Sequence, residues 1–306
     1  MEKEVVFYSN RVKLRGRVCI PNACAGIGNA GFPVAVLAHG YGASKDEFGD
    51  FKLLSGILNE IGVAVLAFDF RGCGDTGYPL GRMLCSSEWV EDLTNAVSFI
   101  CSFSGIDKGR VCLIGESMGA SVAILSAALD MRVKCTIALS PIANGYEWVR
   151  QNWIENKGIK EFELFLEELS EDKKREAIYG QSNLLKMPDA LAYKKRYLDL
   201  IEEIRKVFDD RNFTYYIQYS SVSSIMQMKP IEAVNAISPR PLLLLAGKKD
   251  GIVPWGKNSL KLYENAGEVK KIVAFDNGDH GLLAEPTKPG AIKEITGWLD
   301  RYLIKA

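Results

Sequence analysis

Long hydrophobic runs, histidine and net charge are scarce in this sequence of 306 residues. No apolar stretch reaches the roughly 18 residues of a membrane-spanning helix, and the N-terminal MEKEVVFYSN is charged from its second residue and contains no apolar signal core. We therefore expect no membrane span and a cytoplasmic location. Lysine plus arginine number 38, as do aspartate plus glutamate. This balance argues against nucleic acid or an anionic lipid surface as the partner and favours a small molecule, with a homo-oligomer also possible.

Paired cysteine patterns are also missing. Seven cysteines is an odd number, and no Cys-x-x-Cys pair occurs. Most of the seven lie inside apolar segments. Their positions are Cys19, Cys24, Cys73, Cys85, Cys101, Cys112 and Cys135. We predict that they are reduced core residues and that they bind no metal. The composition, 47% hydrophobic and 25% charged, is otherwise that of an ordinary globular protein with one large core or two modest ones.

Eight β-rich apolar runs alternate with amphipathic segments along most of the chain. The runs cover residues 5–9, 12–20, 33–39, 63–70, 110–115, 133–140, 241–247 and 269–275. Helical patterns cover residues 46–61, 86–102, 118–129, 255–266 and 288–304. The first two runs are typical of an antiparallel hairpin around Ser9 and Asn10, whereas the later ones are almost continuously apolar, as strands covered on both faces must be. The alternation predicts an α/β fold with a mostly parallel central sheet flanked by helices.

Residues 144–236 interrupt this alternation. They contain no comparable β-run and are helical, charged and aromatic, as in KEFELFLEELSEDKKREAIYG. An insertion after the sixth strand leaves the sheet intact and lies over one of its edges. We therefore divide the chain into a core of residues 1–143 and 237–306 and a helical cap of residues 144–236. The cap is either a lid over a pocket or a solvated decoration.

Two glycine-rich segments match the spacing Gly-x-Gly-x-x-Gly of dinucleotide-binding loops. Residues 26–31 precede a strand and open no helix, so we interpret them as a loop. Residues 72–77 follow a strand, but Tyr78-Pro79-Leu80-Gly81 interrupts before the next helical pattern near Ser86. A dinucleotide fold needs the helix to begin within the motif, so that its amide groups meet the pyrophosphate. We therefore predict no cofactor at either segment.

The segment LIGESMGAS, residues 113–121, carries the first chemical signal. Its centre, GESMG, fits Gly-x-Ser-x-Gly, the nucleophile elbow, in which a strand turns abruptly into a helix with the serine at the turn. The strand-like RVCLI precedes it, and an alanine-rich helical pattern follows. Side chains at the two glycine positions would collide with the neighbouring strand or helix. This context predicts that Ser117 is a nucleophile.

A serine nucleophile needs a base to take its proton, and the sequence contains only two histidines. His280 follows the last β-run, so it can return to the elbow at the carboxyl edge of the sheet, and we assign it as the base. His39 would precede the serine by one early strand, an order that the elbow architecture does not use. We assign His39 to loop-bracing hydrogen bonds.

The third member must be a carboxylate that holds the imidazole tautomer and stabilises the imidazolium. Asp250, at the tip of the strand of residues 241–247, is the best placed. Asp276 and Asp279 are the rivals because they are near His280 in the sequence. Such close neighbours seldom reach back to their own histidine correctly, so we assign Asp250.

The tetrahedral intermediate of acyl transfer needs two N–H donors for its oxyanion. We assign one to Met118, which follows the nucleophile and whose amide lies at a helix N-terminus. The other is assigned to Tyr41, because the glycines on either side of it, in His39-Gly40-Tyr41-Gly42, allow its amide to turn inward. The alternative is that this loop is a plain turn between a strand and a helix.

Five motifs now stand in order along the chain: HGYGASKDEF, DFRGCGDTG, GESMG, GKKDGIVP and GDHG. They resemble the oxyanion loop, post-strand turn, elbow, acid loop and histidine loop of the α/β-hydrolase superfamily, and within it they are most similar to the branch of cinnamoyl and feruloyl esterases and dienelactone hydrolase-like proteins. The resemblance covers residues 1–143 and 237–306. It implies an α/β-hydrolase fold and a serine ester hydrolase with a covalent acyl-enzyme and no cofactor. The cap is larger and more helical than is usual in feruloyl esterases, so their substrate is not implied.

We therefore predict a carboxylic-ester hydrolase that acts on a small-molecule acyl ester. A thioesterase, an acyltransferase or an aminopeptidase would use the same machinery. An aminopeptidase would need a cap carboxylate for the substrate amine, whereas the candidates look like one charged, solvated helix: Glu161, Glu163, Glu167 and Glu168. A hydrolase-like binding protein without catalysis is the remaining alternative, and the presence of all three triad residues argues against it.

Aromatic side chains of the cap are candidates for lining an acyl or aryl pocket. The candidates are Trp148, Trp153, Tyr193, Tyr197, Tyr215, Tyr216 and Tyr219. Four of them are assigned to substrate binding: Trp148, Trp153, Tyr215 and Tyr219. Aromatic residues at helical spacing also serve simply as core.

Overall fold

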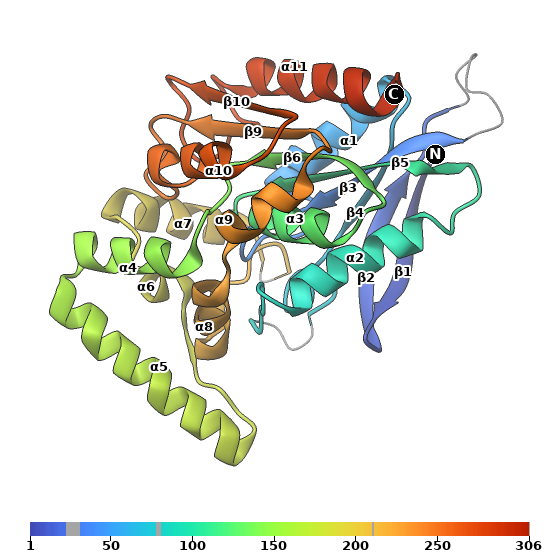
Figure 1. Ribbon diagram of the computed structural model, residues 1–306. Helices are drawn as coiled ribbons and strands as arrows, with labels where there is room; N and C mark the ends of the chain where they lie inside the picture. The colour runs from blue at the N-terminus through green and yellow to red at the C-terminus, as the bar shows by residue number, and fades with distance from the viewer. Residues whose placement is uncertain (23–30, 78–80, 210, 306) are drawn as a thin grey trace.

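The structure is a computed structural model that describes residues 1–22, 31–77, 81–209 and 211–305 (Figure 1). The glycine-rich segment at residues 26–31 therefore lies outside the described residues except for Gly31, and so does Cys24. The other six cysteines are free and buried, as predicted for core residues. Within the described ranges, no helix is long and apolar enough to cross a membrane.

A mixed sheet forms the centre of the described chain, with eight strands in the order β1-β2-β4-β3-β5-β6-β9-β10. The strands are β1 (Glu2–Ser9), β2 (Val12–Cys19), β3 (Phe32–Ala38), β4 (Ala64–Phe68), β5 (Ile106–Glu116), β6 (Val133–Leu139), β9 (Leu242–Gly247) and β10 (Lys270–Phe275). β2 pairs antiparallel with β1 and β4, and every other pairing is parallel. The predicted α/β class, its mostly parallel sheet and the N-terminal hairpin are confirmed.

Helices cover both faces of this sheet (Figure 1). The helices α1 (Asp50–Glu60) and α11 (Lys288–Leu299) lie on one face, and α2 (Glu88–Ile100), α3 (Met118–Leu129) and α10 (Ser259–Asn265) lie on the other. Short helical segments complete the core at η1 (Glu47–Gly49), η2 (Val234–Ile237), η3 (Trp255–Lys257) and η4 (Asp300–Ile304). Alternate strand residues face opposite layers: Val36 packs with α2 and α3, whereas Leu37 packs with α1 and α11.

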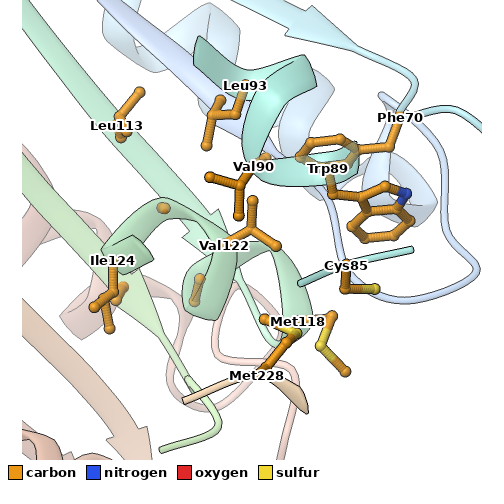
Figure 2. Packing of buried hydrophobic residues seen from close by; sticks show 14 of the residues in the cluster. Phe70, Cys85, Trp89, Val90, Leu93, Leu113, Met118, Val122, Ile124 and Met228 are labelled. Carbon is orange, nitrogen blue, oxygen red and sulfur yellow. The ribbon is translucent and has the colours of Figure 1, made fainter. Parts of the chain in front are cut away.

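The helix after the elbow is held tightly against its neighbours. Val122 of α3 lies beside Val90 of α2, and Met118, the first residue of α3, lies beside Met228 (Figure 2). Ala120 and Ala123 are fully buried, so α3 can lie close to the sheet. Removing large apolar side chains from water is the main force that fixes α3, and with it the turn from which α3 begins.

The inserted residues between β6 and β9 are mostly helical, as expected. Their helices are α4 (Gly145–Asn156), α5 (Ile159–Tyr179), α6 (Met187–Ala190), α7 (Lys195–Val207), α8 (Tyr219–Gln227) and α9 (Pro230–Ala233). A two-stranded antiparallel ribbon of β7 (Leu184–Lys186) and β8 (Tyr216–Gln218) was not predicted. Its strands are three residues long and partly exposed, so no apolar run marks them. Helix α5 projects away from the body of the molecule (Figure 1).

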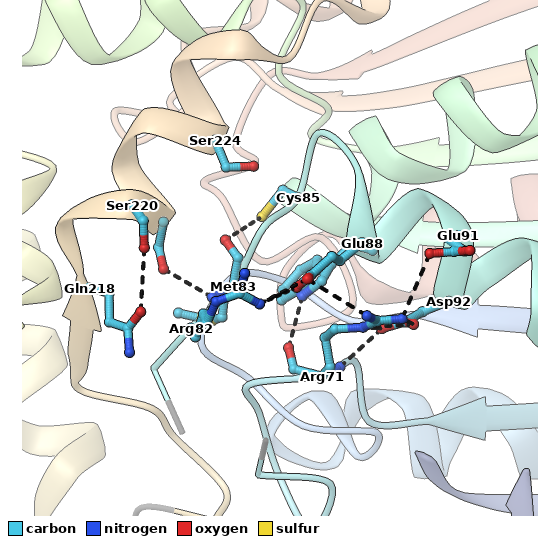
Figure 3. A network of polar contacts seen from close by, with 12 residues as sticks. Arg71, Arg82, Met83, Cys85, Glu88, Glu91, Asp92, Gln218, Ser220 and Ser224 are labelled. Atoms are coloured by element: carbon cyan, nitrogen blue, oxygen red, sulfur yellow. Dashed lines mark hydrogen bonds and ion pairs between the residues drawn. The ribbon is translucent and has the colours of Figure 1, made fainter. Parts of the chain in front are cut away.

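Polar contacts join the cap to the loop after β4. The backbone N–H of Met83 donates to Ser221 Oγ at 2.9 Å, and that of Ser86 donates to Ser224 Oγ at 3.0 Å. Below them the buried Arg71 bonds both carboxylate oxygens of Asp92 through its Nε, at 3.0 Å each (Figure 3). A buried charge is tolerated only when it is paired in this way, so the Arg71–Asp92 pair is a structural contact of the core.

The glycine-rich segment at residues 72–77 closes around a carboxylate of the chain itself. A Cβ atom on Gly74 would overlap the carboxylate of Asp69, which accepts hydrogen bonds from the backbone N–H of Lys45 at 2.6 Å and of Asp75 at 3.0 Å. In the part of the chain that the structure describes, the next helix begins at Glu88. The segment therefore lacks the helix start that a dinucleotide-binding loop requires.

Candidate active site

Ser117 lies in the turn between the last residue of β5 and the first residue of α3, with φ 54° and ψ −117°. A non-glycine residue rarely adopts positive φ, and such strain persists only where the surroundings enforce it. A Cβ atom on Gly115 would overlap the backbone of Gly119, and one on Gly119 would overlap the carbonyl oxygens of Ala38 and His39. Gly115 thus lets the strand lie against the start of α3, and Gly119 lets the strained turn approach β3 closely, for the steric reason expected from the sequence.

The three predicted triad residues come together at the carboxyl edge of the sheet. His280 Nε2 lies 2.9 Å from Ser117 Oγ, and His280 Nδ1 lies 2.8 Å from Asp250 Oδ2. Both distances are hydrogen-bond lengths. The Ser140 hydroxyl, at the end of β6, donates to the His280 carbonyl at 3.1 Å and so helps to fix the histidine loop.

The Asp250 carboxylate is held by backbone hydrogen bonds in addition to its contact with His280. Its Oδ1 accepts the backbone N–H groups of Ile252 and Val253, at 2.8 Å each, which leaves Oδ2 for His280. Its side chain is 1% exposed. A carboxylate held in this way orients the imidazole with little freedom to turn.

The charge on His280 is set by opposing effects. Burial disfavours the imidazolium, but the negative charge of Asp250 and its hydrogen bond outweigh burial, and the carboxyl groups of Glu116 and Asp279 add to them. The net result is a pKa of His280 that is raised above the ordinary 6.5. His280 is therefore easier to protonate than an exposed histidine, which suits a base that must become cationic during the reaction.

The rival carboxylates do not contact the imidazole. Asp276 is mostly exposed and pairs with Lys248 at 2.6 Å. Asp279 Oδ1 accepts the backbone N–H of His280 at 2.9 Å and the Tyr197 hydroxyl at 2.7 Å. Asp279 thus organises the backbone of the histidine loop, and Asp250 meets the ring.

The loop after β3 lies directly over the serine. The point that a Cβ atom on Gly40 would occupy is 3.6 Å from Ser117 Cβ. In the described turns and loops, neither the Tyr41 nor the Met118 N–H donates to another backbone group, and the first N–H groups of a helix have no partner within it. The structure therefore leaves both predicted oxyanion donors unused by the backbone beside Ser117.

His39 braces this loop and stays away from the serine. Its Nε2 accepts the backbone N–H of Phe70 at 3.1 Å, so Nδ1 carries the proton and donates to the Gly40 carbonyl at 2.8 Å. Burial, opposed by the bond to Gly40, lowers the pKa of His39 to about 4. His39 is therefore neutral at physiological pH, in the loop-bracing position expected from the sequence.

A cavity of about 410 Å³ opens onto Ser117 and His280. One wall comes from the core, including Tyr41 and Phe48, and the other from the cap, where the apolar side chains are Met187, Leu200, Ile201, Ile204 and Phe213. Among the described lining residues, His280 is the only one that can carry a positive charge. A cavity with an apolar wall and a few polar groups at one end fits an uncharged organic ligand.

Five carboxyl groups also border this cavity, those of Glu47, Asp50, Glu116, Asp279 and Glu285. Glu47 accepts the backbone N–H of Gly40, and burial raises its pKa to about 8 despite that hydrogen bond, with the charge of Asp50 adding to the rise. Burial likewise raises the pKa of Glu116 well above its ordinary value, and Glu47, Asp50 and Asp250 add to the effect while His280 opposes it. Glu47 and Glu116 are therefore largely neutral near pH 7.

The four aromatic residues assigned to substrate binding do not line this cavity. Trp148 donates to the Ile252 carbonyl at 2.7 Å, Trp153 stacks on Phe165, and the hydroxyls of Tyr215 and Tyr219 donate to Glu202 and Glu168. They are packing and hydrogen-bonding residues of the cap because their apolar faces are covered by neighbouring helices. The cap tyrosines that do reach the cavity are Tyr193 and Tyr197.

Helix α7 supplies aliphatic lining residues that were not predicted, beside the candidate Tyr197. Tyr197, Leu200, Ile201 and Ile204 all border the cavity from this helix. Their spacing of i, i+3, i+4 and i+7 is that of one helix face, and this was the signal available in the sequence. The cap glutamates on α5 are exposed and lie outside the lining, as expected of a solvated helix. Within the described chain, no group of three or more His, Cys, Asp or Glu side chains could hold a metal ion.

Comparison with known proteins places this geometry in a family. Residues 33–287 match the family described as serine aminopeptidase, S33. The chain is 24% identical over 281 residues to the thiohydrolase aneE of Aspergillus aculeatus, which covers 89% of this chain and 84% of that protein. The crystal structure of the α/β hydrolase GrgF from Penicillium sp. sh18 is similar with a TM-score of 0.80 at 19% identity, covering 99% of both chains.

A ferulic acid complex of Est1E from Butyrivibrio proteoclasticus is similar with a TM-score of 0.67 at 17% identity, covering 98% of this chain and 99% of that one. These likenesses confirm the predicted α/β-hydrolase fold, with the helical insertion after β6. The family match spans most of the sequence, from β3 to the start of α11. The chain belongs to the serine aminopeptidase S33 family of the α/β-hydrolase superfamily.

Proposed function

We propose that this protein is a serine hydrolase that cleaves carboxylic esters through a covalent acyl-enzyme. One observation carries the proposal: Ser117 Oγ, the His280 ring and the Asp250 carboxylate form a continuous hydrogen-bonded chain that ends in a cavity. A serine is weakly nucleophilic until an adjacent base takes its proton, and this chain supplies the base and the group that orients it.

In the acylation step, Ser117 Oγ attacks the ester carbonyl carbon while its proton passes to His280 Nε2. The carbonyl oxygen becomes an oxyanion, which the N–H groups of Tyr41 and Met118 stabilise. The tetrahedral intermediate then collapses, the bond to the leaving oxygen breaks, and the proton on Nε2 passes to that oxygen. Alcohol leaves, and the acyl group remains on Ser117.

Deacylation repeats these roles with water as the nucleophile. His280 takes a proton from water as its oxygen attacks the acyl carbon, and the same two amides hold the second oxyanion. Collapse returns the proton from His280 to Ser117 Oγ and releases the carboxylic acid. Asp250 stays ionised throughout, because its role is to stabilise the imidazolium.

The composition of the cavity walls favours an uncharged, largely apolar acyl or aryl group. The cap contributes an aliphatic wall from α7, so residues 144–236 serve as a lid in this proposal. An anionic group on the substrate would face the carboxyl groups of Asp279 and Glu285, and the described lining residues include no lysine or arginine to balance its charge. The closer assignment to the feruloyl-esterase branch stays a prediction.

A second candidate is thioester hydrolysis, favoured by the relative aneE, which is named a thiohydrolase and covers most of this chain. The acyl-enzyme route is the same, with a thiolate as the leaving group. Matched acyl chains on p-nitrophenol and on N-acetylcysteamine therefore separate the two functions by their ratio of kcat/KM.

The test of the proposal is replacement of Ser117 by alanine. Ser126→Ala is the matched control. Ser126 is a buried serine of α3, the helix that begins directly after Ser117, and its hydroxyl donates to the Val90 carbonyl without bordering the cavity. We expect Ser117→Ala to lose hydrolysis of p-nitrophenyl butyrate and labelling by a fluorophosphonate probe, while Ser126→Ala keeps both. Turnover or labelling that survives in Ser117→Ala would overturn the assignment.

A further inference from the structure

Helix α7 of the cap contacts both loops that carry the predicted acid and base. Tyr197, in its first turn, is 4% exposed and directs its hydroxyl between the acid loop after β9 and the histidine loop after β10. The hydroxyl accepts the backbone N–H of Gly251 at 2.8 Å and donates to Asp279 Oδ1 at 2.7 Å. One side chain of the cap thus bridges two segments of the core.

The bridge ends on the immediate neighbours of the triad residues. Gly251 follows Asp250, and Asp279 Oδ1 also accepts the backbone N–H of His280 at 2.9 Å. A continuous chain therefore runs from the Gly251 N–H through the Tyr197 hydroxyl and the Asp279 carboxylate to the His280 N–H. Hydrogen bonds in such a chain polarise one another, and bonds to a charged acceptor are the stronger ones.

Contacts of two further residues, Arg196 and Trp148, support this bridge. Arg196 Nη2 contacts the Tyr197 hydroxyl and reaches Asp279 Oδ2 at 3.2 Å and the Lys249 carbonyl at 3.2 Å. On the other side of the acid loop, Trp148 of α4 donates to the Ile252 carbonyl. Burial, helped by the bond to Asp279, raises the pKa of Tyr197 to about 12, so the phenol keeps the proton that it donates.

The acid loop is shaped to receive this tyrosine. A Cβ atom on Gly251 would lie 2.9 Å from the Tyr197 hydroxyl oxygen and 3.1 Å from its ring carbon Cε2. Gly251 does not have a positive φ in the described chain, so its backbone conformation alone does not require glycine. The absence of a side chain at this position is therefore explained by the approach of the cap.

We propose that Tyr197 is a positioning residue of the hydrolase, which fixes the spacing between Asp250 and His280 through their neighbours Gly251 and Asp279. The triad is then fully ordered only while α7 is docked on the two loops, so the position of the cap governs the reactivity of Ser117. This inference rests on the proposed function, because the residues being positioned are the proposed acid and base.

The primary test is Tyr197→Phe, which keeps the ring in the cavity wall and removes only the hydroxyl. Since a displacement of about 1 Å between reacting groups can cost roughly a hundredfold in rate, we expect kcat for p-nitrophenyl butyrate to fall about tenfold, with KM changed less than twofold. Tyr215→Phe is the matched control, because its hydroxyl anchors the same helix through Glu202 at 2.8 Å without touching either loop.

A second readout needs no substrate. The protein has two histidines, and His39, with a pKa lowered to about 4, does not titrate near neutrality, so NMR of the ring Hε1 protons follows His280 directly. The ionisable groups facing His280 are Asp250, Glu116 and Asp279, and Arg196 reaches Asp279. A looser contact with Asp250 removes part of what raises the His280 pKa, so its midpoint should move to lower pH in Tyr197→Phe and stay unchanged in Tyr215→Phe.

The pairing with Gly251 gives a third constraint. Gly251→Ala should push the tyrosine away and shift kcat and the His280 midpoint in the same directions as Tyr197→Phe. The double variant should be no worse than the more affected single variant, because both changes break one contact. Additive losses would contradict the bridge.

The inference is overturned if Tyr197→Phe matches the wild type in both kcat and His280 midpoint, or if Tyr215→Phe changes both equally. A wild-type protein that hydrolyses no ester in a Ser117-dependent way would instead refute the proposed function. The NMR titration still decides whether Tyr197 positions His280 in that case, so the two failures are distinguishable.

Discussion

Glu47 offers a prediction whose sign and size follow from the structure. Its carboxyl group is 6% exposed and accepts the backbone N–H of Gly40, next to the proposed oxyanion donor Tyr41. Burial raises its pKa from 4.5 to about 8, against the opposing hydrogen bond from Gly40 and with the charge of Asp50 adding to the rise. Glu47→Gln keeps an amide oxygen for Gly40 and removes the ionisable group.

The sign of the effect of Glu47 on the free energy of unfolding follows from the protons bound in the folded and unfolded states. Between pH 4.5 and about 8 the folded protein holds a proton on Glu47 that the unfolded chain has lost, so the free energy of unfolding falls as pH rises. The contribution is fully present below pH 4.5 and is gone above pH 8. Each pH unit in this window costs about 1.4 kcal/mol, which sets an upper bound of about 5 kcal/mol for Glu47.

Glu47→Gln should therefore stabilise the protein increasingly with pH. We expect almost no gain at pH 4.5, up to about 3.5 kcal/mol at pH 7 and up to about 5 kcal/mol above pH 8. Urea unfolding of both proteins, followed by tryptophan fluorescence at several pH values, measures the difference. Asp69 and Asp92 also have raised pKa values, but they are present in both proteins and cancel. Glu116 adds to the effect of the substitution in the same direction, because the Glu47 charge helps to raise its pKa. A difference that stays constant across pH would refute the assignment of a raised pKa to Glu47.

Three further predictions concern the site and its support. The acid limit of kcat/KM should have its midpoint above pH 6.5, because the base must be neutral and its pKa is raised, and Asp250→Asn should move that midpoint to lower pH. Asp92→Ala, which leaves the buried Arg71 without its main partner, should cost about 3–5 kcal/mol in thermal or urea unfolding. Gly119→Ala should cost about 3 kcal/mol and abolish fluorophosphonate labelling, since its methyl group would overlap the carbonyl oxygens of β3 and the following loop. A fully labelled, equally stable Gly119→Ala protein would contradict the description of the turn.

Most strands of the sheet could be predicted from the sequence because they are apolar runs of the kind that is covered on both faces, and the first two because they are typical of an antiparallel hairpin. All eight predicted runs correspond to strands of the sheet. The elbow follows from local sterics, since a side chain at Gly115 or Gly119, two positions from Ser117, would overlap the neighbouring backbone. The proposed acid and base were placed by elimination and topology: only two histidines were available, and parallel strands bring their carboxyl ends to one edge.

The cap could be predicted only as helical. Which aromatic side chains face the cavity depends on how α7 rotates against the core, and that rotation is set by contacts between residues far apart in the sequence. Trp148 and Tyr215 are prominent in the sequence, yet both donate hydrogen bonds within the protein: Trp148 to the Ile252 carbonyl and Tyr215 to the Glu202 carboxylate. Aromatic content alone therefore does not separate these packing residues from Tyr193 and Tyr197, which line the cavity.

Asp279 shows that sequence position can argue against one role for a residue without revealing the contacts that it makes. Beside His280 in the sequence, it looked like a poor rival for the triad, and its carboxylate indeed bonds the backbone of the loop rather than the ring. Its second acceptor position is filled by Tyr197, 82 residues earlier, and no local pattern links the two. The residues that carry chemistry can be found by type and order, whereas those that hold them in place are selected by tertiary contact, which is why the link between cap and triad emerges only from the structure.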